Sequence, residues 1–135
     1  MNDADAWRRF ASVPTVTLAT VAPSGAPRLV PVTFAVVEGP RVITAVDHKP
    51  KSTRRLARLS DIERDPRVTL LADRYDDDWS GLWWVRVGGS ALVSSEPPPG
   101  AAALTERYRQ YRAHPPEGPW ITVTPTSVTG WGITE

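Results

Sequence analysis

Four cations near the middle of the chain are spaced as if on one face of a helix. They stand at positions i, i+3, i+4 and i+7, and they are Lys51, Arg54, Arg55 and Arg58. Such neighbours repel one another by roughly 0.2–0.5 kcal/mol per pair, and cations in a first helical turn also oppose the helix dipole. A bound anion would reverse both effects, because a helix N-terminus with added Lys or Arg side chains binds phosphate. We therefore interpret this segment as a phosphate site; a solvated basic face is the plainer alternative.

The residues around these cations support the phosphate interpretation. Lys49 and Lys51 are the only lysines in the chain, whereas arginine is the cation everywhere else. The segment follows an apolar run, 42–46, that is typical of a strand, and Pro50 suits the first position of a helix. His48 could donate a hydrogen bond to a phosphate or to a substrate carbonyl, although a lone histidine is more often a polar loop residue.

Composition narrows the classes of function. The chain has 135 residues, of which 41% are hydrophobic and 23% charged, and its formal net charge is +1. These values fit one globular domain over residues 1–135 and give no general attraction to nucleic acid or to an anionic membrane. The absence of cysteine excludes thiol catalysis and cysteine-ligated metals. No apolar stretch is long enough to span a membrane and the first residues do not resemble a secretory signal, so we expect a cytoplasmic location.

Frequent prolines and glycines favour short strands over long helices. Periodicity and turn residues predict helices at 3–12, 50–64 and 101–113, and strands at 15–21, 27–37, 41–46, 67–73, 82–93, 120–124 and 127–132. Pro31 interrupts the second strand and indicates either a bulge that exposes backbone or an ordinary edge position. A bend is expected at Gly88–Gly89. Strands in hairpin order with few helices predict a mainly β (α+β) fold, a small antiparallel barrel capped by helices.

Several segments occur in an order that matches a known family. They are Asp47-His48-Lys49-Pro50-Lys51, Arg54-Arg55-Leu56-Ala57-Arg58-Leu59, Asp65-Pro66-Arg67-Val68, Tyr75-Asp76-Asp77-Asp78-Trp79-Ser80, Leu82-Trp83-Trp84-Val85-Arg86 and Thr129-Gly130-Trp131. Together they resemble the flavin-binding split-barrel proteins related to pyridoxamine 5′-phosphate oxidase, and most closely the branch that uses the deazaflavin coenzyme F-420. The resemblance covers nearly the whole chain and implies an antiparallel split β-barrel, the FMN-binding split barrel, with a few capping helices.

The resemblance also implies where a cofactor would bind. It implies a homodimer with two cofactor sites at the subunit interface, in which the Lys/Arg segment holds the cofactor phosphate. Lys51 is then the first choice for that contact and Arg58 the alternative, because this segment is about a turn longer than in many relatives. Strand backbone would line the ring, and two tryptophans would pack near the ring or the dimer seam. The implied cofactor-binding residues are Pro31, Val32, Thr33, Thr44, Ala45, Val46, Lys49, Lys51, Arg54, Arg55, Arg58, Trp79 and Trp131.

For function, the resemblance implies an oxidoreductase that transfers hydride from reduced coenzyme F-420 to a small enone or quinone-like acceptor, without a metal. The sequence shows no catalytic constellation, which suits cofactor chemistry because there the protein supplies binding and orientation. FMN is the alternative cofactor, since it also carries a fused ring and a phosphate. A flavin-, deazaflavin- or tetrapyrrole-binding protein without turnover is the alternative from another class. The near-neutral charge argues against a nucleic-acid-binding barrel.

Overall fold

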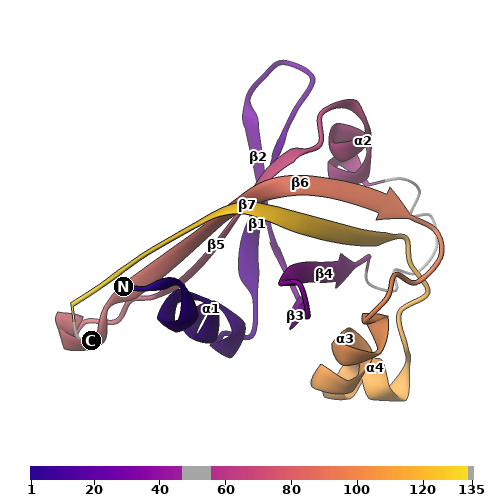
Figure 1. The fold of residues 1–135 in the computed structure, drawn as a ribbon. Coiled ribbons are helices and arrows are strands. Elements are labelled where there is room, and N and C mark those ends of the chain that lie inside the picture. The colour runs from indigo at the N-terminus through magenta and orange to yellow at the C-terminus, as the bar shows by residue number, and fades with distance from the viewer. Residues whose placement is uncertain (47–55, 134–135) are drawn as a thin grey trace.

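The computed structural model describes residues 1–46 and 56–133 and shows one curled antiparallel sheet with short helices against it (Figure 1). In this part of the chain, seven strands lie in the order β2-β1-β5-β6-β7-β4-β3. The strands are β1 (Val16–Val21), β2 (Pro27–Val32), β3 (Ala35–Val37), β4 (Arg41–Ala45), β5 (Arg67–Arg74), β6 (Trp83–Ser94) and β7 (Trp120–Gly132). The helices are α1 (Asp3–Ser12), α2 (Ala57–Arg64), α3 (Ala101–Arg107) and α4 (Arg109–Ala113), with a 3-10 turn, η1, at Trp79–Gly81. The expected mainly β, antiparallel split barrel is confirmed.

Every second side chain along the strands points to the inner, concave face of the curled sheet. In β1, buried and half-exposed residues alternate, as a strand with one covered face requires, and the buried ones are Val16, Leu18 and Thr20. α1 packs against this interior, where the fully buried Phe10 meets Phe34 edge-on with 5.2 Å between the ring centroids. α2 contributes Leu59 and Ile62 to the same core. The barrel interior is therefore covered by two helices that lie far apart in the sequence.

The predicted strand 27–37 is two strands, so that prediction is wrong. β2 and β3 lie at opposite edges of the sheet, and the chain passes between them through Thr33 and Phe34. Pro31 pairs with Thr17 in an unbroken register. It is therefore an edge-strand proline, which needs no ladder hydrogen bond on its outer side, and the alternative of a bulge is wrong.

The long pairing of β6 with β7 is kinked where a bend was predicted. Its register shifts between Gly88 and Gly89, close to Pro125 of β7. A Cβ atom on Gly89 would lie 2.4 Å from the backbone oxygen of Thr124, so only glycine allows the two strands to approach this closely. β7 is continuous, and the predicted pair of separate strands around Pro125 is wrong because β6 pairs with the chain on both sides of the proline.

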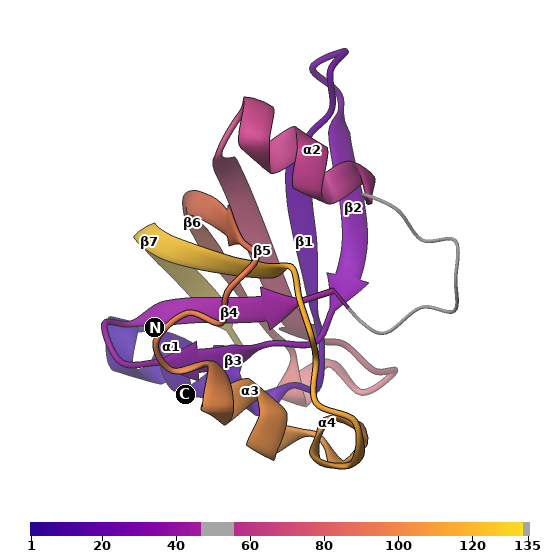
Figure 2. The same cartoon turned by 90° about the vertical axis from the view of Figure 1, so that its right-hand side faces the viewer.

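The predicted helix 101–113 is broken at Tyr108, whose backbone is extended (φ −111°, ψ 133°). The two resulting helices, α3 and α4, pack beside β3 and β4 (Figure 2). Their buried residues form a second core with one face of β4, and this core comprises Ala35, Ile43, Ala45, Ala101, Leu104, Tyr111 and Trp120. The other face of β4 belongs to the barrel interior, as Val42 shows. β4 is thus buried on both faces.

The predicted helix 50–64 also differs from the structure. Leu56 has extended backbone (φ −74°, ψ 150°), and α2 starts at Ala57. An unbroken helix from Pro50 is therefore wrong, and no single helical face runs through Leu56. α2 ends at Arg64, before Asp65-Pro66, as predicted. Among the described residues, no helix is long and apolar enough to cross a membrane.

Candidate functional site

Two of the predicted binding segments approach each other where the sheet splits. β3 pairs with β4 through Ala35 and Ile43, and the pairing stops there. Continuing that register by two residues would set Thr33 opposite Ala45. The backbone of Phe34 instead bonds to the side chains of Arg107, at the end of α3, and of Tyr108, between α3 and α4. The β2–β3 link and the end of β4 are therefore neighbours that no strand ladder joins. We call this place the split.

Most of the predicted strand residues turn their side chains into the two cores. Val32 and Val46 belong to the barrel interior and Ala45 to the second core. The side chains at these three positions are buried, and the predicted lining of a ring by their backbone stays a prediction. Thr44 is 2% exposed, and its hydroxyl has no hydrogen-bond partner among the described residues. Thr33 is the half-buried exception, and its side chain borders an open groove.

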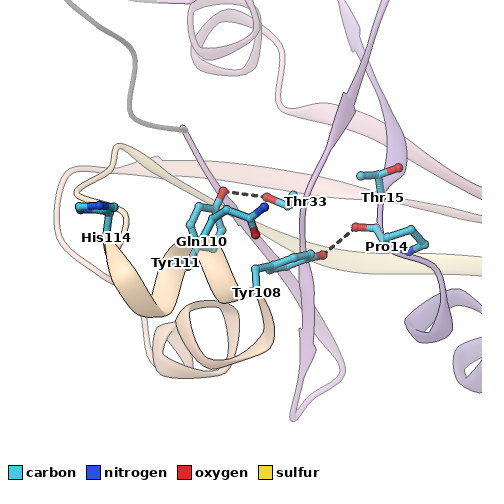
Figure 3. Close-up of a pocket in the computed structure, with 7 residues that line it drawn as sticks. All are labelled: Pro14, Thr15, Thr33, Tyr108, Gln110, Tyr111 and His114. Carbon is cyan, nitrogen blue, oxygen red and sulfur yellow. Dashed lines mark hydrogen bonds between the residues drawn. The ribbon is translucent and has the colours of Figure 1, made fainter.

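This groove has a volume of about 700 Å³ and runs between α4 and the start of β1 (Figure 3). Its lining residues are Pro14, Thr15, Thr33, Tyr108, Gln110, Tyr111 and His114. Of these described lining residues, Thr33 alone belongs to the predicted site. The volume lies within the range of about 300–1,000 Å³ that small-molecule sites occupy.

Tyr108 joins the two walls of the groove. Its hydroxyl lies 2.8 Å from the carbonyl oxygen of Pro14 and 3.0 Å from that of Phe34, and it accepts a hydrogen bond of 3.1 Å from the Phe34 N–H. Burial raises the pKa of Tyr108, so the hydroxyl stays protonated and can donate. Arg107 reinforces the junction by donating to the carbonyl oxygens of Phe34, at 2.8 Å, and Val13. The helix break at Tyr108 thus fixes the position of α4 against the barrel.

Thr33 and Tyr111 point toward each other in the groove (Figure 3), and their hydroxyl oxygens are 2.8 Å apart. Tyr111 is 6% exposed, and its ring meets that of Tyr108 edge-on at 5.5 Å. Gln110 and His114 are exposed. The groove therefore combines a fixed aromatic wall with two exposed polar side chains.

The predicted phosphate-binding cations are only partly described. Arg58 lies in the first turn of α2 and is half-buried. Leu56, the residue before this helix, provides no side-chain cap for its first N–H groups. The other predicted cations lie outside the described residues, and they are Lys49, Lys51, Arg54 and Arg55.

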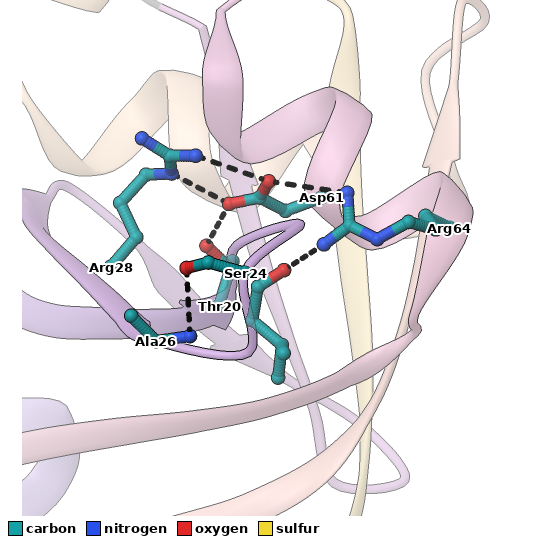
Figure 4. Close-up of polar contacts among 7 residues, drawn as sticks. Thr20, Ser24, Ala26, Arg28, Asp61 and Arg64 are labelled. Atoms are coloured by element: carbon teal, nitrogen blue, oxygen red, sulfur yellow. Dashed lines mark hydrogen bonds and ion pairs between the residues drawn. The ribbon is translucent and has the colours of Figure 1, made fainter.

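A buried carboxylate anchors α2 to the β1–β2 hairpin (Figure 4). Asp61 is 1% exposed and accepts hydrogen bonds from Thr20 Oγ1 at 2.8 Å and from Arg28 Nε at 2.7 Å. Arg64 lies 3.7 Å from the same carboxylate and also donates to a carbonyl oxygen of β1. The Arg28 guanidinium, with help from the Thr20 hydroxyl, holds the pKa of Asp61 below its ordinary value despite burial. The network therefore fixes α2, and with it the helix's first turn.

Trp79 and Trp131 lie at the other end of the sheet from the split. Trp131 stands opposite Trp84 near one end of β7, whereas Ala45 stands opposite Trp120 at the other end. At roughly 3.3 Å per residue the intervening stretch of β7 is about 35 Å long. Trp79 lies in η1, directly before the start of β6 that pairs with this distal end. The two tryptophans are 64% and 48% exposed, and neither reaches the split of its own chain.

Sequence reasoning missed the groove and the carboxylate network. Tyr108 and Tyr111 fall within the predicted single helix 101–113, and no local spacing indicates that Tyr111 reaches the β2–β3 link. Asp61 did carry a signal, since it stands between the apolar positions Leu59 and Ile62, and a carboxylate that becomes buried needs partners. In the described ranges, no group of three or more His, Asp or Glu residues could hold a metal ion.

Comparison with solved structures agrees with this architecture. A conserved hypothetical protein of Mycobacterium tuberculosis is 24% identical, with a TM-score of 0.75 over 98% of this chain and 86% of that one. An FAD binding protein of Mycobacterium smegmatis is 19% identical, with a TM-score of 0.63 over 96% and 93% of the two chains. HutZ, the heme storage protein of Vibrio cholerae, is 12% identical, with a TM-score of 0.69 over 96% and 93%. At these identities the likeness establishes a shared fold.

Family membership rests on the sequence itself. No curated protein matches this sequence. The family model described as pyridoxamine 5′-phosphate oxidase, however, matches residues 4–132, which takes in every strand and helix described above except the first residue of α1. The chain therefore belongs to the pyridoxamine 5′-phosphate oxidase family of split-barrel proteins.

Proposed function

We propose that this protein is a dimeric oxidoreductase that transfers hydride from reduced coenzyme F-420 to a small activated acceptor, such as an enone or a quinone. The family fits a flavin-type oxidoreductase or flavin-binding role. F-420 is a deazaflavin, so its fused ring and phosphate make the same demands on a binding site as those of FMN. The choice of F-420 rests on the sequence segments that resemble the F-420 branch.

The observation that carries the proposal is the split between the β2–β3 link and the end of β4. A flat ring with polar edges needs backbone beside it that is not closed off by a ladder, and the β3–β4 ladder ends at the split, where two elements border it. The buried hydroxyl of Thr44, which lacks a partner among the described residues, fits a ligand or water placed there. Thr33 borders the same place with a half-buried polar side chain.

The start of α2 supports a phosphate contact. Leu56 does not cap its first N–H groups, and Arg58 adds a positive charge in the same turn. Both features favour an anion. Lys49, Lys51, Arg54 and Arg55 precede this helix in the sequence and complete the proposed set, with Lys51 as the main contact and Arg58 as its alternative.

The outer face of the sheet supports a homodimer. Strand pairing sets Pro31, Thr17, Leu71 and Arg86 side by side across β2, β1, β5 and β6. Exposed apolar side chains lie on this face, including Leu29 at 64%, Leu71 at 38% and Trp131 at 48%. A second copy would cover them, as exposed apolar patches favour association. A dimer would also allow Trp79 and Trp131 of one chain to approach the split of the other chain. The two tryptophans do not reach the split of their own chain.

With the cofactor bound, the residues of this chain have three tasks. The reduced deazaflavin supplies the hydride, so the protein binds it, orients it and excludes water. The backbone at the split would set the plane of the ring, and the cations would hold the phosphate. Asp61 acts indirectly, because it fixes the helix on which Arg58 lies.

Binding without turnover is the second candidate. The structural likeness to a heme storage protein favours it, since that protein carries a planar ligand on the same fold. FMN in place of F-420 is the alternative within the enzymes. One assay distinguishes the proposed F-420 enzyme from both alternatives. It measures the reduction of a panel of enones and quinones by reduced F-420 or reduced FMN under anaerobic conditions.

The matched variants for this assay are Lys51→Ala, Arg58→Ala and Arg8→Ala. Loss of the charged phosphate contact should weaken cofactor binding by about 1–3 kcal/mol, or about 5- to 150-fold in Kd. Arg8 is the control, because its exposed side chain pairs with Asp5 on α1, and this is its one ion pair among the described residues. Holoprotein that reduces no acceptor would favour the binding-only candidate. Unchanged affinity in both Lys51→Ala and Arg58→Ala would contradict the phosphate assignment.

A further inference from the structure

The β2–β3 link is held at Phe34 by two consecutive residues that come much later in the chain. Tyr108 accepts a hydrogen bond of 3.1 Å from the Phe34 N–H, and Arg107 donates one of 2.8 Å to the Phe34 carbonyl oxygen. These two residues stand 74 and 73 positions after Phe34. Both polar groups of the Phe34 backbone therefore have side-chain partners from the α3–α4 segment.

The same two side chains tie the link to the chain between α1 and β1. The Tyr108 hydroxyl lies 2.8 Å from the carbonyl oxygen of Pro14 (Figure 3), and Arg107 also donates to the carbonyl oxygen of Val13. Because Arg107 already donates to the Phe34 carbonyl, the single proton of the Tyr108 hydroxyl can go to Pro14. Each of the two side chains thus bridges the link and the segment that precedes β1.

The side chain of Phe34 is held as well. Its ring is fully buried and meets the ring of Phe10 on α1 edge-on, with 5.2 Å between the centroids. The Arg107 guanidinium lies over the Phe34 ring, 4.5 Å from its centroid, where a cation is attracted to an aromatic face. Backbone and ring of Phe34 are both fixed, and so is the path of the link on either side of this residue.

This junction lies directly beside the predicted cofactor segment. Phe34 follows residues 31–33, and the β3–β4 ladder ends before Thr33 and Ala45. The two borders of the split are therefore kept in position by contacts outside the ladder, and the junction at Phe34 supplies such contacts. A site whose walls are ordered in advance binds a rigid ring more tightly than one whose walls must be ordered on binding.

We propose that Arg107 and Tyr108 are positioning residues of the cofactor site. They hold the β2–β3 link at the separation from the end of β4 that the cofactor ring requires, and they act through Phe34 rather than by touching the ring. The inference rests on the proposed function in one respect, namely that the ring binds at the split. The hold on the link itself can be measured without cofactor.

The test measures cofactor affinity and turnover in variants of the two residues. Arg107→Met and Tyr108→Phe keep the approximate size of each side chain and remove its polar group. We expect each variant to raise the Kd for F-420 and the KM for reduced F-420 about three- to tenfold, because the link must then be ordered on binding. The kcat at saturating cofactor should stay within about twofold of wild type, since the bound ring restores the order of the link. Arg107→Lys keeps the charge and a shorter donor, so its Kd should lie between those of wild type and Arg107→Met.

Two controls separate positioning from a general loss of stability. Arg112→Met makes the same change at an exposed residue of α4, whose guanidinium bonds to the carbonyl oxygen of Glu106 within the helical segment. Gly89→Ala strains the crossing of β6 and β7. Both controls should leave the Kd for F-420 unchanged, and thermal unfolding shows which variants are destabilised.

Amide hydrogen exchange of the apoprotein tests the junction without cofactor. The amides of Thr33, Phe34 and Ala35 should exchange faster in Arg107→Met and Tyr108→Phe than in wild type, because the link opens more often once a bond to Phe34 is lost. Arg112→Met should leave these exchange rates unchanged.

Three results would overturn the inference. The first is unchanged exchange at the link in both Arg107→Met and Tyr108→Phe, which would mean that the junction does not hold it. The second is faster exchange with wild-type cofactor affinity, and the third is an equal loss of affinity in Gly89→Ala.

Failure of the proposed function gives a different result, because it is seen in the wild type. A wild type that binds F-420 but reduces no acceptor contradicts the enzyme, while the Kd values of the variants still decide the positioning role. If the wild type prefers FMN, the same titrations are made with FMN. A wild type that binds neither cofactor contradicts both the proposed function and the positioning role.

Discussion

The hydroxyl oxygens of Thr33 and Tyr111 lie 2.8 Å apart although the residues are 78 positions apart in the sequence. The first belongs to the β2–β3 link and the second to α4. Their contact joins the place where the sheet splits to the helix that forms the groove. The contact therefore brings a predicted cofactor-binding residue and the groove into one structural unit.

The Thr33 and Tyr111 hydroxyls should stabilise the fold together, so that the effects of removing each one are not additive. Tyr111→Phe removes the partner that the half-buried Thr33 hydroxyl has among the described residues, and Thr33→Val removes this contact from the Tyr111 hydroxyl. We expect each variant to lower the free energy of unfolding by about 0.5–1.5 kcal/mol. The double variant should lose less than the sum, as a double-mutant cycle in urea would show. Strict additivity would mean that the two hydroxyls do not interact.

Asp61 should contribute more to the free energy of unfolding than an exposed ion pair does. Asp61→Ala leaves the buried Thr20 hydroxyl without an acceptor, whereas the Arg28 side chain is 41% exposed and can be hydrated. The expected loss is about 1–3 kcal/mol of unfolding free energy, measured by urea denaturation. Asp5→Asn is the matched control, because it removes a pair whose side chains are 67% and 42% exposed and should change little. Similar losses in both variants would contradict the anchoring role of Asp61.

The same carboxylate makes stability depend on pH. Folding lowers the pKa of Asp61, chiefly through Arg28. The ionised carboxylate therefore contributes its full share of the free energy of unfolding above the ordinary Asp pKa of about 3.9, and this share is lost as pH falls through the lower pKa of the folded state. The stability difference between wild type and Asp61→Asn should therefore be large at pH 6 and shrink below about pH 4. A difference that stays constant across this range would show that the pKa of Asp61 is not lowered by folding.

Gly89 should tolerate no side chain. A Cβ atom there would lie 2.4 Å from the Thr124 backbone oxygen, and backbone cannot move aside as a flexible side chain can. Gly89→Ala should destabilise the fold by about 1–3 kcal/mol, as overpacking typically does. Gly81→Ala is the control, since a Cβ at Gly81 meets nothing within 4 Å. Thermal unfolding of the two variants decides the comparison, and equal melting temperatures would contradict the close crossing of β6 and β7.

The homodimer proposal can be tested on the outer face of the sheet. Leu29→Glu and Leu71→Glu place a charge on exposed apolar positions of β2 and β5. We expect both to shift the protein toward monomer in sedimentation velocity, because a carboxylate at an interface must be desolvated. Leu92→Glu is the control, since this exposed leucine lies beyond the Gly88–Gly89 kink. A wild-type protein that sediments as a monomer at all concentrations would exclude the dimer.

The sequence was informative about the fold wherever one residue type determined the local geometry. Asp65-Pro66 ended α2, and the Gly88–Gly89 pair marked the kink in β6. The errors arose where tertiary contacts, rather than local sequence, determined where a strand or helix ends. Strand 27–37 shows no local break at Thr33, because the split is made by the side chains of Tyr108 and Arg107 that bond to Phe34. Helix 101–113 has good helical periodicity, and it breaks where Tyr108 reaches across to Pro14, just before β1.

The site was less predictable than the fold. Residues 31–33 and 44–46 were expected in one site from family resemblance, and the register of β3 with β4 now gives a structural reason for their proximity. Their side chains could not be assigned from sequence, since both faces of β4 are buried in different cores. The groove depends on α4 lying against the β2–β3 link, a contact with no local signature. The predicted roles of Lys51 and Arg58 stay predictions.

The most direct test of the central claim is a tryptophan-fluorescence titration of the apoprotein with coenzyme F-420 and, in parallel, with FMN. Six tryptophans provide the signal. The account predicts saturable quenching by F-420 at micromolar concentration, a much weaker response to FMN, and loss of the F-420 response in Lys51→Ala or Arg58→Ala but not in Arg8→Ala. Tighter binding of FMN would assign the protein to the flavin-using enzymes, and no binding of either cofactor would contradict the proposed oxidoreductase.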